Sequence, residues 1–418
     1  MRMRTPLLAS TAALAMLGLA ACGSGSGSGG SDDGAIVWDM WSGSQADTDA
    51  LNETLEIVKK ENPDVDVRLQ TAPWNDYFTK LTTNMSSGNL ACLTSMNGQR
   101  LSTYADAFEP LTDADLKTAG ISRDDFAPGA LDIMTYDDQL LGLPFDVSTM
   151  LVYYNKDLID AAGAPEPKIG WSFDDFEATA QGATTDATKG FAVGLGEFQW
   201  MALPIAMSGQ QPVGEDGTLA LTDPAFADAA TWYSGLVTDQ EVALPAASAS
   251  DTGWGENQYS GGNAAMAVDG TWNAVSYLGN DAGFDAGMVD LPTGEAGSTS
   301  LVLGSGYGIA KGCENKEAAL KVLGSLVGKD AQDAMATSGR SYPARAESQP
   351  LYFSSLDKSV RGEVEAAFDA AFADVEAQRS TKDWDKVNTA LQPDLVSVYN
   401  GQATMTDVLG QTQQQFGE

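Results

Sequence analysis

The amino-acid sequence predicts an α/β protein with two lobes. Segments that favour β-strands alternate with segments that carry apolar residues at helical spacing, which is typical of a largely parallel sheet covered by helices. The chain has 418 residues, and this length exceeds what one hydrophobic core usually supports. We therefore expect two lobes, each with its own sheet.

Strands and helices alternate closely in the first quarter of the chain. Strands are expected over 35–41, 65–70 and 91–95, with helices from Asp47 or Thr48 to Asn62 and over 74–88. In parallel sheets, ligands bind at the carboxyl ends of the strands. The residues expected to contact a ligand there are Trp41, Ser42, Ser44 and Asn97, with a plain loop as the alternative for each.

The stretch Leu141–Gly163 predicts a loop, a buried strand and a short helix. Pro144 keeps the residue before it out of the helical region, so the first part cannot be helix. Met150–Tyr154 is β-branched and aromatic, which favours a buried strand. Asn155 can then cap a helix that Gly163 ends.

Capping signals continue in the second half. Ser172, with Asp175 three residues later, predicts a capping box, and Pro224 after Asp223 predicts another helix start. Trp200 follows an expected strand over 190–195 and is expected either to stack on a ligand or to pack in the core. Further helices are expected over 316–328, 360–377, 384–399 and 405–416.

Gly261–Trp272 resembles an element of a known family in which a small-residue helix end, a strand and a turn present a tryptophan at the ligand cleft. A flat indole ring is suited to stack on the C–H face of a pyranose, while neighbouring polar groups bind the hydroxyls. Trp272 is therefore a candidate ligand platform, with a buried structural role as the alternative. Trp254, in a Gly-rich segment just upstream, is a second candidate.

Two of these stretches carry a resemblance to a known family. The first combines Gly142-Leu143-Pro144, the strand end Tyr-Tyr-Asn-Lys-Asp and the helix start Trp171–Phe176. The second is Gly261–Trp272. Together they resemble the extracellular solute-binding proteins of ABC importers, more narrowly the maltose-binding-protein-like, oligosaccharide-binding group (family 1). The resemblance implies a type II periplasmic-binding-protein-like fold, with a ligand cleft between lobes that hinge strands join. It implies an N-terminal lobe of 35–145 plus 291–341 and a C-terminal lobe of 146–290 plus 342–418.

The same resemblance implies ligand contacts at the places where the chain passes between lobes. These are Asp146 and Ser148 at the first crossover, Gly304 and Ser305 where the chain returns, and Arg340 or Tyr342 at the third crossover. The glycines near Gly304 form no phosphate loop, because the Lys-Ser/Thr ending of a Walker motif is absent.

The N-terminus predicts export and anchoring. Arg2 and Arg4 precede an apolar run over 7–20 that is too short to span a membrane, so residues 1–21 are expected to be a signal peptide. Leu-Ala-Ala-Cys-Gly resembles the bacterial lipobox, in which Cys22 becomes the lipidated first residue. Residues 22–34 then form a flexible Gly/Ser tether. We expect a lipoprotein on the outer face of the bacterial cell membrane.

The amino-acid composition of the chain argues against several classes of function. The net charge of −35 makes nucleic acid and anionic membrane surfaces poor partners. The chain has no histidine, so it lacks the usual general base and zinc ligand, and no metal or cofactor is expected. The resemblance places Cys92 and Cys313 in one lobe and so implies a disulfide in an oxidising compartment, although their spacing alone leaves the pairing open.

The resulting hypothesis is a monomeric binding protein that captures a neutral oligosaccharide and delivers it to an ABC importer permease. The alternative is a secreted glycoside hydrolase or lyase, which could use a carboxylate pair without histidine. The sequence does not repeat βα units eight times, as a barrel hydrolase would. A purely adhesive lipoprotein is a third possibility, but it would not need aromatic turns at strand ends.

Overall fold

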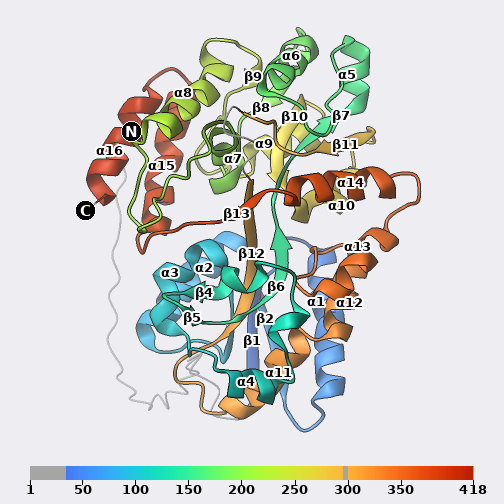
Figure 1. The fold of residues 1–418 in the computed structure, drawn as a ribbon, viewed down its shortest axis with the longest axis vertical. Helices are drawn as coiled ribbons and strands as arrows, with labels where there is room; N and C mark the ends of the chain where they lie inside the picture. The colour runs from blue at the N-terminus through green and yellow to red at the C-terminus, as the bar shows by residue number, and fades with distance from the viewer. Residues whose placement is uncertain (1–33, 295–299, 418) are drawn as a thin grey trace, which may run out of the picture.

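The computed structural model of the chain describes residues 34–294 and 300–417. It has two lobes, one above the other in Figure 1, and strands β6 (Leu143–Ser148) and β12 (Ser300–Ile309) run from one toward the other. This two-lobed α/β architecture confirms the predicted fold class. The expected signal peptide, Cys22 and nearly all of the expected tether lie outside the described residues.

The first lobe is built on a mixed sheet with the strand order β13-β12-β3-β1-β2, in which β6 also pairs with β12. The strands β1, β2 and β3 are parallel, while β12 is antiparallel to β3 and β6. The strand bounds are β1 (Ile36–Trp41), β2 (Val67–Ala72), β3 (Leu93–Asn97) and β13 (Val375–Ala377), with a small hairpin of β4 (Thr135–Tyr136) and β5 (Gln139–Leu140). The helices are α1 (Gln45–Glu61), α2 (Trp74–Ser87), α3 (Leu101–Tyr104), α4 (Asp113–Ala119), α11 (Lys316–Leu326) and α12 (Lys329–Ser338).

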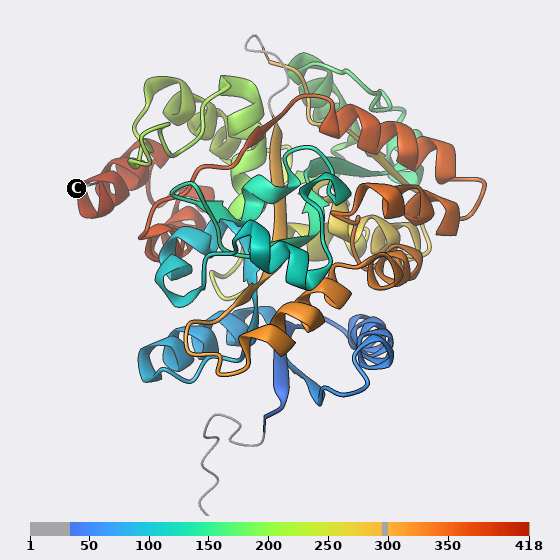
Figure 2. The same ribbon diagram turned by 60° about the horizontal axis from the view of Figure 1, so that its bottom comes forward.

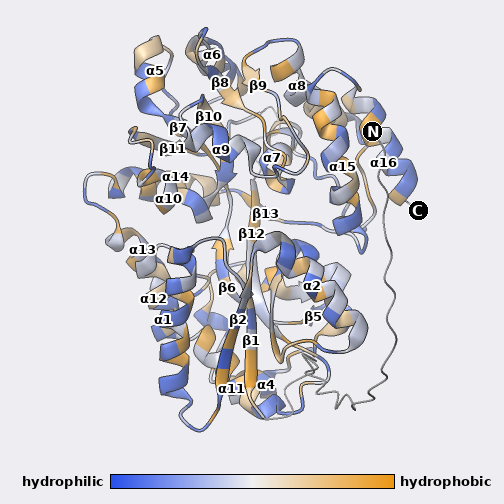
Figure 3. Ribbon diagram, turned by 180° about the vertical axis from the view of Figure 1, so that it is seen from behind, coloured by the Kyte–Doolittle hydropathy of each residue, from blue (hydrophilic) through white to orange (hydrophobic). Residues whose placement is uncertain are grey.

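The core of the first lobe forms where β1 meets its flanking helices. Trp38 and Met40 alternate with half-exposed residues along β1 and are completely buried, as a strand of period two requires. Helix α1 directs Val58 into the same core. Figure 3 shows the largely hydrophobic strand β1 at the centre of this lobe, with hydrophilic residues along the helices around it. A disulfide joins Cys92, just before β3, to Cys313, just before α11.

The second lobe is built on a sheet with the order β11-β7-β10-β8-β9. Its central strands β7 (Met150–Asn155) and β10 (Ala264–Gly270) are buried along their whole length, so their sequences carry no polar alternation. The other strands are β8 (Lys189–Ala192), β9 (Ala243–Leu244) and β11 (Ala286–Val289). The helices are α5 (Lys156–Ala162), α6 (Phe173–Ala183), α7 (Glu197–Ser208), α8 (Pro224–Thr238), α9 (Trp254–Ser260), α10 (Ala274–Leu278), α13 (Gln349–Ser355), α14 (Arg361–Phe372), α15 (Trp384–Tyr399) and α16 (Met405–Phe416).

Strand β12 links the two lobes physically. It runs through the middle of the molecule, as Figures 1 and 2 show. Near its start, Leu301 and Leu303 pack into the core of the second lobe, whereas Tyr307 and Ile309 pack into the core of the first. Beside it, β6 continues through Thr149 directly into β7, and the Thr149 hydroxyl bonds the Ser300 hydroxyl at 2.6 Å.

Two sequence-based expectations about these linking strands were wrong. Residues 143–148 were expected to be loop, but they form β6, because Pro144 tolerates extended backbone and all six side chains are buried beside β12. Residues 375–377 were expected to end a helix, but they form β13, which pairs in parallel with the start of β12. Helix α14 ends at Phe372, three residues earlier.

Within the described part of the chain, no helix is both long enough and apolar enough to cross a membrane.

Candidate functional site

Strand ends from both lobes lie close to the crossover between β6 and β7. Strand β1 ends at Trp41, whose ring lies 6.1 Å from that of Phe145 in β6. Strand β10 ends at Gly270, which pairs with Met150 at the start of β7. We call the facing residues at these strand ends the interlobe site. This is where α/β sheets place their ligands.

Aromatic rings line the first-lobe side of the interlobe site. Trp41 contacts Trp74 edge to face, with ring centroids 4.9 Å apart, and Trp74 itself is 36% exposed. Phe78 packs against both, at 6.0 Å from Trp41 and 4.8 Å from Trp74. Trp74 was missed as a site residue because its helical spacing indicated packing. Its position directly after β2 was the signal that could have identified it.

Arg100 connects the first lobe to the second. Its guanidinium lies over the rings of Phe78 and Trp74, at 4.5 and 5.3 Å from their centroids. From there its Nε lies 2.7 Å from Asp385 Oδ1 at the start of α15, and its Nη1 lies 3.4 Å from Glu197 Oε2 at the start of α7. Burial raises the pKa of Glu197, and Arg100 opposes that rise. Sequence reasoning missed this cluster because its members are distant along the chain.

Hydrogen bonds reinforce the same flank between the lobes. The Ser380 hydroxyl donates to the Gln99 carbonyl at 2.6 Å, and the Ser102 hydroxyl donates to the Thr381 carbonyl at 2.8 Å. The segment between β13 and α15 is therefore fastened to the turn after β3.

Asp146 is a buried acid on the hinge strand β6. Its Oδ1 accepts a hydrogen bond from the Ser305 amide at 2.7 Å. Burial raises the pKa of Asp146 to about 6, although this hydrogen bond and the charge of Arg340 both lower it. Gly304 allows the close approach, because a Cβ there would lie 2.5 Å from the Asp146 carbonyl oxygen. Asp146 and Ser305 thus tie the two hinge strands together.

Polar and aromatic groups form the second-lobe side of the site. The Trp272 ring lies on the backbone of Gly270, where a Cβ would be 2.2 Å from the ring. Trp272 and Trp254 are both partly buried against the core of this lobe. The fully buried carboxyl of Asp269 lies at the same strand end. Glu256, in the first turn of α9, interacts electrostatically with Asp269, and burial followed by that interaction raises its pKa to about 8.

Several predicted contact residues have local bonding roles in the structure. Ser44 caps α1 by accepting from the Asp47 amide at 3.1 Å, and Asn97 accepts from the Gln99 amide at 3.1 Å. Ser42 bonds the Thr48 hydroxyl at 2.7 Å. Ser148 is buried in β6, opposite Leu303 of β12.

The remaining predicted residues divide between the site and the core. Arg340 forms an ion pair with Asp47 and lies 5.6 Å from the centroid of the Phe145 ring, beside the interlobe site. Tyr342 packs instead among the rings of Tyr352, Phe353, Phe368 and Phe372.

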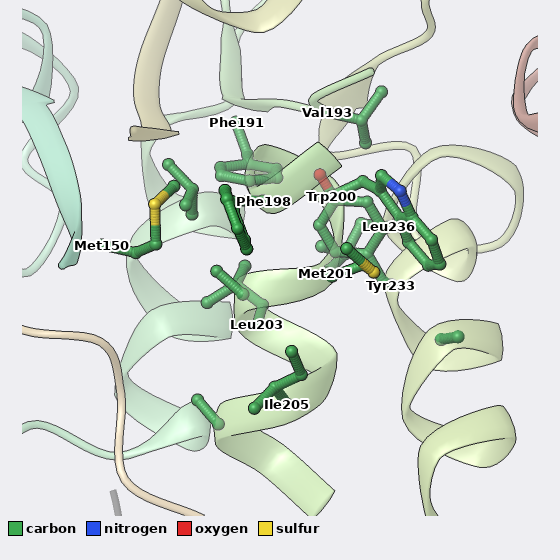
Figure 4. Close-up of a cluster of buried hydrophobic side chains, with 14 of the residues drawn as sticks. Met150, Phe191, Val193, Phe198, Trp200, Met201, Leu203, Ile205, Tyr233 and Leu236 are labelled. Atoms are coloured by element: carbon green, nitrogen blue, oxygen red, sulfur yellow. The ribbon is translucent and has the colours of Figure 1, made fainter. Parts of the chain in front are cut away.

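Trp200 lies deep in the core of the second lobe. It is 1% exposed and packs against Phe226 at a ring distance of 6.1 Å. Figure 4 shows its ring among Met201, Tyr233 and Leu236. The structure therefore favours the packing alternative for this residue.

The site has the chemistry of a binding site for a polar ligand with apolar faces. Its carboxyl groups outnumber its two guanidinium groups, which are already paired with Asp47, Glu197 and Asp385. In residues 34–294 and 300–417, no cluster of three or more acidic or cysteine side chains could hold a metal ion. A pocket of about 100 Å³ between Tyr136, Gly304 and Ser380 is too small for a disaccharide.

Comparisons with known proteins identify relatives along most of the chain. Residues 53–360 match the family described as bacterial extracellular solute-binding protein. A lactose-binding protein of Rhizobium radiobacter is 24% identical over 293 residues, which cover 67% of each chain. A maltooligosaccharide ABC transporter solute-binding lipoprotein of Streptococcus pneumoniae is 24% identical over 365 residues, which cover 83% of this chain and 82% of that one.

A solved structure shares the two-lobed arrangement. An ABC substrate-binding protein from Listeria monocytogenes, in complex with cycloalternan, superposes with a TM-score of 0.81 and 25% identity over 91% of this chain and 97% of that one. The family match covers well over half of the described chain and agrees with the fold. The chain therefore belongs to the family of bacterial extracellular solute-binding proteins.

Proposed function

We propose that the protein binds a carbohydrate, in the first place a neutral oligosaccharide, between its lobes and delivers it to the permease of an ABC importer. One observation carries this proposal: tryptophan side chains lie at strand ends of both lobes beside the crossover. Trp41 and Trp74 lie on the first lobe and Trp254 and Trp272 on the second. Such rings stack on sugar faces. The names of the relatives, which are sugar-binding proteins, support the same ligand class.

Closure of the lobes would couple binding to delivery. We assign 35–145 plus 291–341 to one moving body and 146–290 plus 342–418 to the other. A ligand favours the closed state because only that state offers contacts from both lobes. The residues we assign to the sugar hydroxyls are Ser42, Ser44, Asn97, Asp146, Gly304, Ser305 and Arg340. An unpaired buried hydroxyl costs about 1 to 3 kcal/mol, which would let the site reject the wrong epimer.

We further propose a monomer held at the outer face of the cell membrane by a lipid on Cys22. The signal-peptide pattern and the small-residue run after Cys22 support this location. Incorporation of labelled fatty acid that is lost in Cys22→Ser would support the anchor. Labelling that persists in the variant would show that Cys22 is not the lipidated residue.

The enzyme alternative has no comparable support. The relatives whose names give a ligand are sugar-binding proteins.

The test is a thermal-shift screen of the chain from Ser31 onward against mono- and oligosaccharides. A ligand that binds only the folded state raises the unfolding temperature. A clear shift with one linkage class, with the sugar recovered intact, supports the proposal. Absence of any shift argues for a different solute, and recovery of cleaved sugar would favour the enzyme.

A further inference from the structure

A short segment between β13 and α15, residues 378–383, has both of its ends fixed in the second lobe. At the first end, the side-chain amide of Gln211 donates to the Ala377 carbonyl at 3.0 Å and accepts from the Arg379 amide at 2.9 Å. At the other end, Trp384 is 1% exposed and packs in the core of the second lobe. The segment therefore moves with the second lobe.

The middle of this segment is hydrogen-bonded to the first lobe. Ser380 Oγ donates to the Gln99 carbonyl at 2.6 Å, and Ser102 Oγ donates to the Thr381 carbonyl at 2.8 Å. The two hydroxyl oxygens lie 3.1 Å from each other. Ser102 is buried, so water has little access to compete for these bonds. Each lobe thus supplies one hydroxyl donor and one carbonyl acceptor to the contact.

Three more side chains of the first lobe extend the same contact. Thr103 Oγ1 donates to the Lys382 carbonyl at 2.9 Å, and the Tyr104 hydroxyl donates to Asp385 Oδ2 at 3.3 Å. Arg100 pairs with the other oxygen of the same carboxylate. Movement of the lobes away from each other at this flank would break all of these bonds together.

We call residues 99–104 and 380–385 together the lobe clasp. All of its donors and acceptors belong to the chain itself, so no ligand is needed to form it. We propose that the lobe clasp holds the two lobes together before a sugar binds, so that a sugar enters the interlobe site only when the clasp opens. This inference goes beyond the proposed function, because it concerns how the ligand enters and not which ligand is taken.

The lobe clasp has a consequence for the rate of binding. Two lobes that only a ligand joins would rest in the open state and close when the ligand arrives. The contacts of the lobe clasp instead favour the closed state, so the open state that admits sugar is a minor population. The observed binding rate should therefore level off at the opening rate as the sugar concentration rises. The apparent affinity is reduced by the same small open fraction.

The first experiment measures the shape of the protein in solution. Ser102→Ala combined with Ser380→Ala removes both hydroxyl donors and is the clasp variant. Ser86→Ala combined with Ser397→Ala is the matched control, because these hydroxyls donate to carbonyls within their own helices, α2 and α15. Small-angle scattering without sugar should give a larger radius of gyration for the clasp variant than for the wild type and the control. Added sugar should contract the clasp variant and leave the wild type nearly unchanged.

The second experiment measures the binding rate by stopped-flow tryptophan fluorescence. The probes are maltotriose, lactose and cellobiose. With a probe that binds, the wild-type rate should reach a plateau as the sugar concentration rises. The plateau of the clasp variant should be about fivefold or more higher, because the variant lacks two hydrogen bonds that oppose opening. The control should behave like the wild type.

The outcomes separate this inference from the proposed function. Equal radii of gyration without sugar, with equal contraction on sugar binding, would overturn the clasp and leave the proposed function standing. A wild-type rate that stays proportional to sugar concentration would do the same, and this measurement holds even if the clasp variant does not fold. If no probe binds, the radii without sugar still decide on the clasp, while the proposed function loses its support.

Discussion

The guanidinium of Arg100 joins the two lobes through Asp385, with 2.7 Å between Nε and Oδ1. Arg100 follows β3 in the first lobe, whereas Asp385 begins α15 in the second. The arginine is already held over Phe78 within its own lobe. Arg100 is therefore anchored in the first lobe, and Asp385 is the partner that would separate from it if the two lobes moved apart.

Arg100→Gln should loosen this flank. The variant leaves Glu197 and Asp385 without their cation, and both are mostly buried, so we expect the free energy of unfolding to fall by about 1 to 3 kcal/mol. Small-angle scattering should show a larger radius of gyration for the ligand-free variant. Arg123→Gln is the matched control, because Arg123 pairs with Asp113 at 3.3 Å on an exposed surface, where such pairs contribute about 0 to 1 kcal/mol. An unchanged radius of gyration in Arg100→Gln would show that Arg100 does not hold the two lobes together.

Trp272→Ala should weaken sugar binding by more than about tenfold, because a stacking ring supplies apolar contact that no neighbour replaces. The fold should persist, since the ring is only partly buried against the core. Calorimetric titration with the sugar found by the screen provides the measurement. Trp232→Ala on α8 is the control: it removes a partly buried tryptophan that bonds Glu177 at 2.5 Å. An unchanged affinity for the sugar in Trp272→Ala would show that Trp272 does not stack on it.

Glu256 should make stability fall as the pH rises. Burial raises its pKa from 4.5 to about 8, so the folded state binds this proton more tightly than the unfolded chain does. Between these two values the contribution of Glu256 to the free energy of unfolding decreases with pH, by at most about 1.4 kcal/mol per unit. Denaturant titrations across this range should show a steeper loss for the wild type than for Glu256→Gln. Parallel curves would contradict the raised pKa.

The bond between Cys92 and Cys313 should be a major source of stability. It closes a loop with a sequence separation of 221 residues, and disulfides of this kind stabilise by about 2 to 5 kcal/mol. Intact mass should increase by two hydrogens on reduction, and the double Cys→Ser variant should unfold at lower denaturant concentration. A mass that reduction leaves unchanged would show that the thiols are unpaired.

Gly304→Ala should destabilise the hinge. A Cβ there would meet the Asp146 carbonyl oxygen at 2.5 Å, and the φ of 155° is one that side chains rarely adopt. We expect a loss of about 1 to 3 kcal/mol, measured by denaturant unfolding. Gly410→Ala is the control, because Gly410 lies in α16 with open space around it and alanine favours helix. Equal stabilities for the two variants would contradict the strain argument.

Local signals predicted the helices well. Asn155 caps α5 by accepting from the Leu158 amide at 3.0 Å, and Ser172 and Asp175 form the expected capping box of α6. Strand β13 was missed because three residues, two of them exposed, carry no periodic signal. Its conformation is set by the neighbouring start of β12, which sequence order does not reveal.

The site was predictable only in outline. Trp41 and Trp272 follow strands whose apolar character is visible in the sequence, so their position at the sheet ends could be inferred. The cluster of Arg100, Glu197 and Asp385 could not, because only the packing of two lobes brings these charges together. Glu256 and Asp269 were likewise missed, since nothing in a sequence distinguishes a buried acid from the many exposed ones.

The position of the disulfide has a consequence for the order in which the protein is made. Cys92 is synthesised long before Cys313, and all five strands of the second-lobe sheet, from β7 to β11, lie between them in the chain. The first lobe also lacks α11 and α12 until after Cys313 is made. Neither lobe is therefore complete when Cys313 is made, because α13 to α16 of the second lobe also follow it, and Cys92 remains a free thiol until then. We expect nascent chains that stop before Cys313 to be open to thiol-reactive labelling at Cys92, and completed chains to be closed to it.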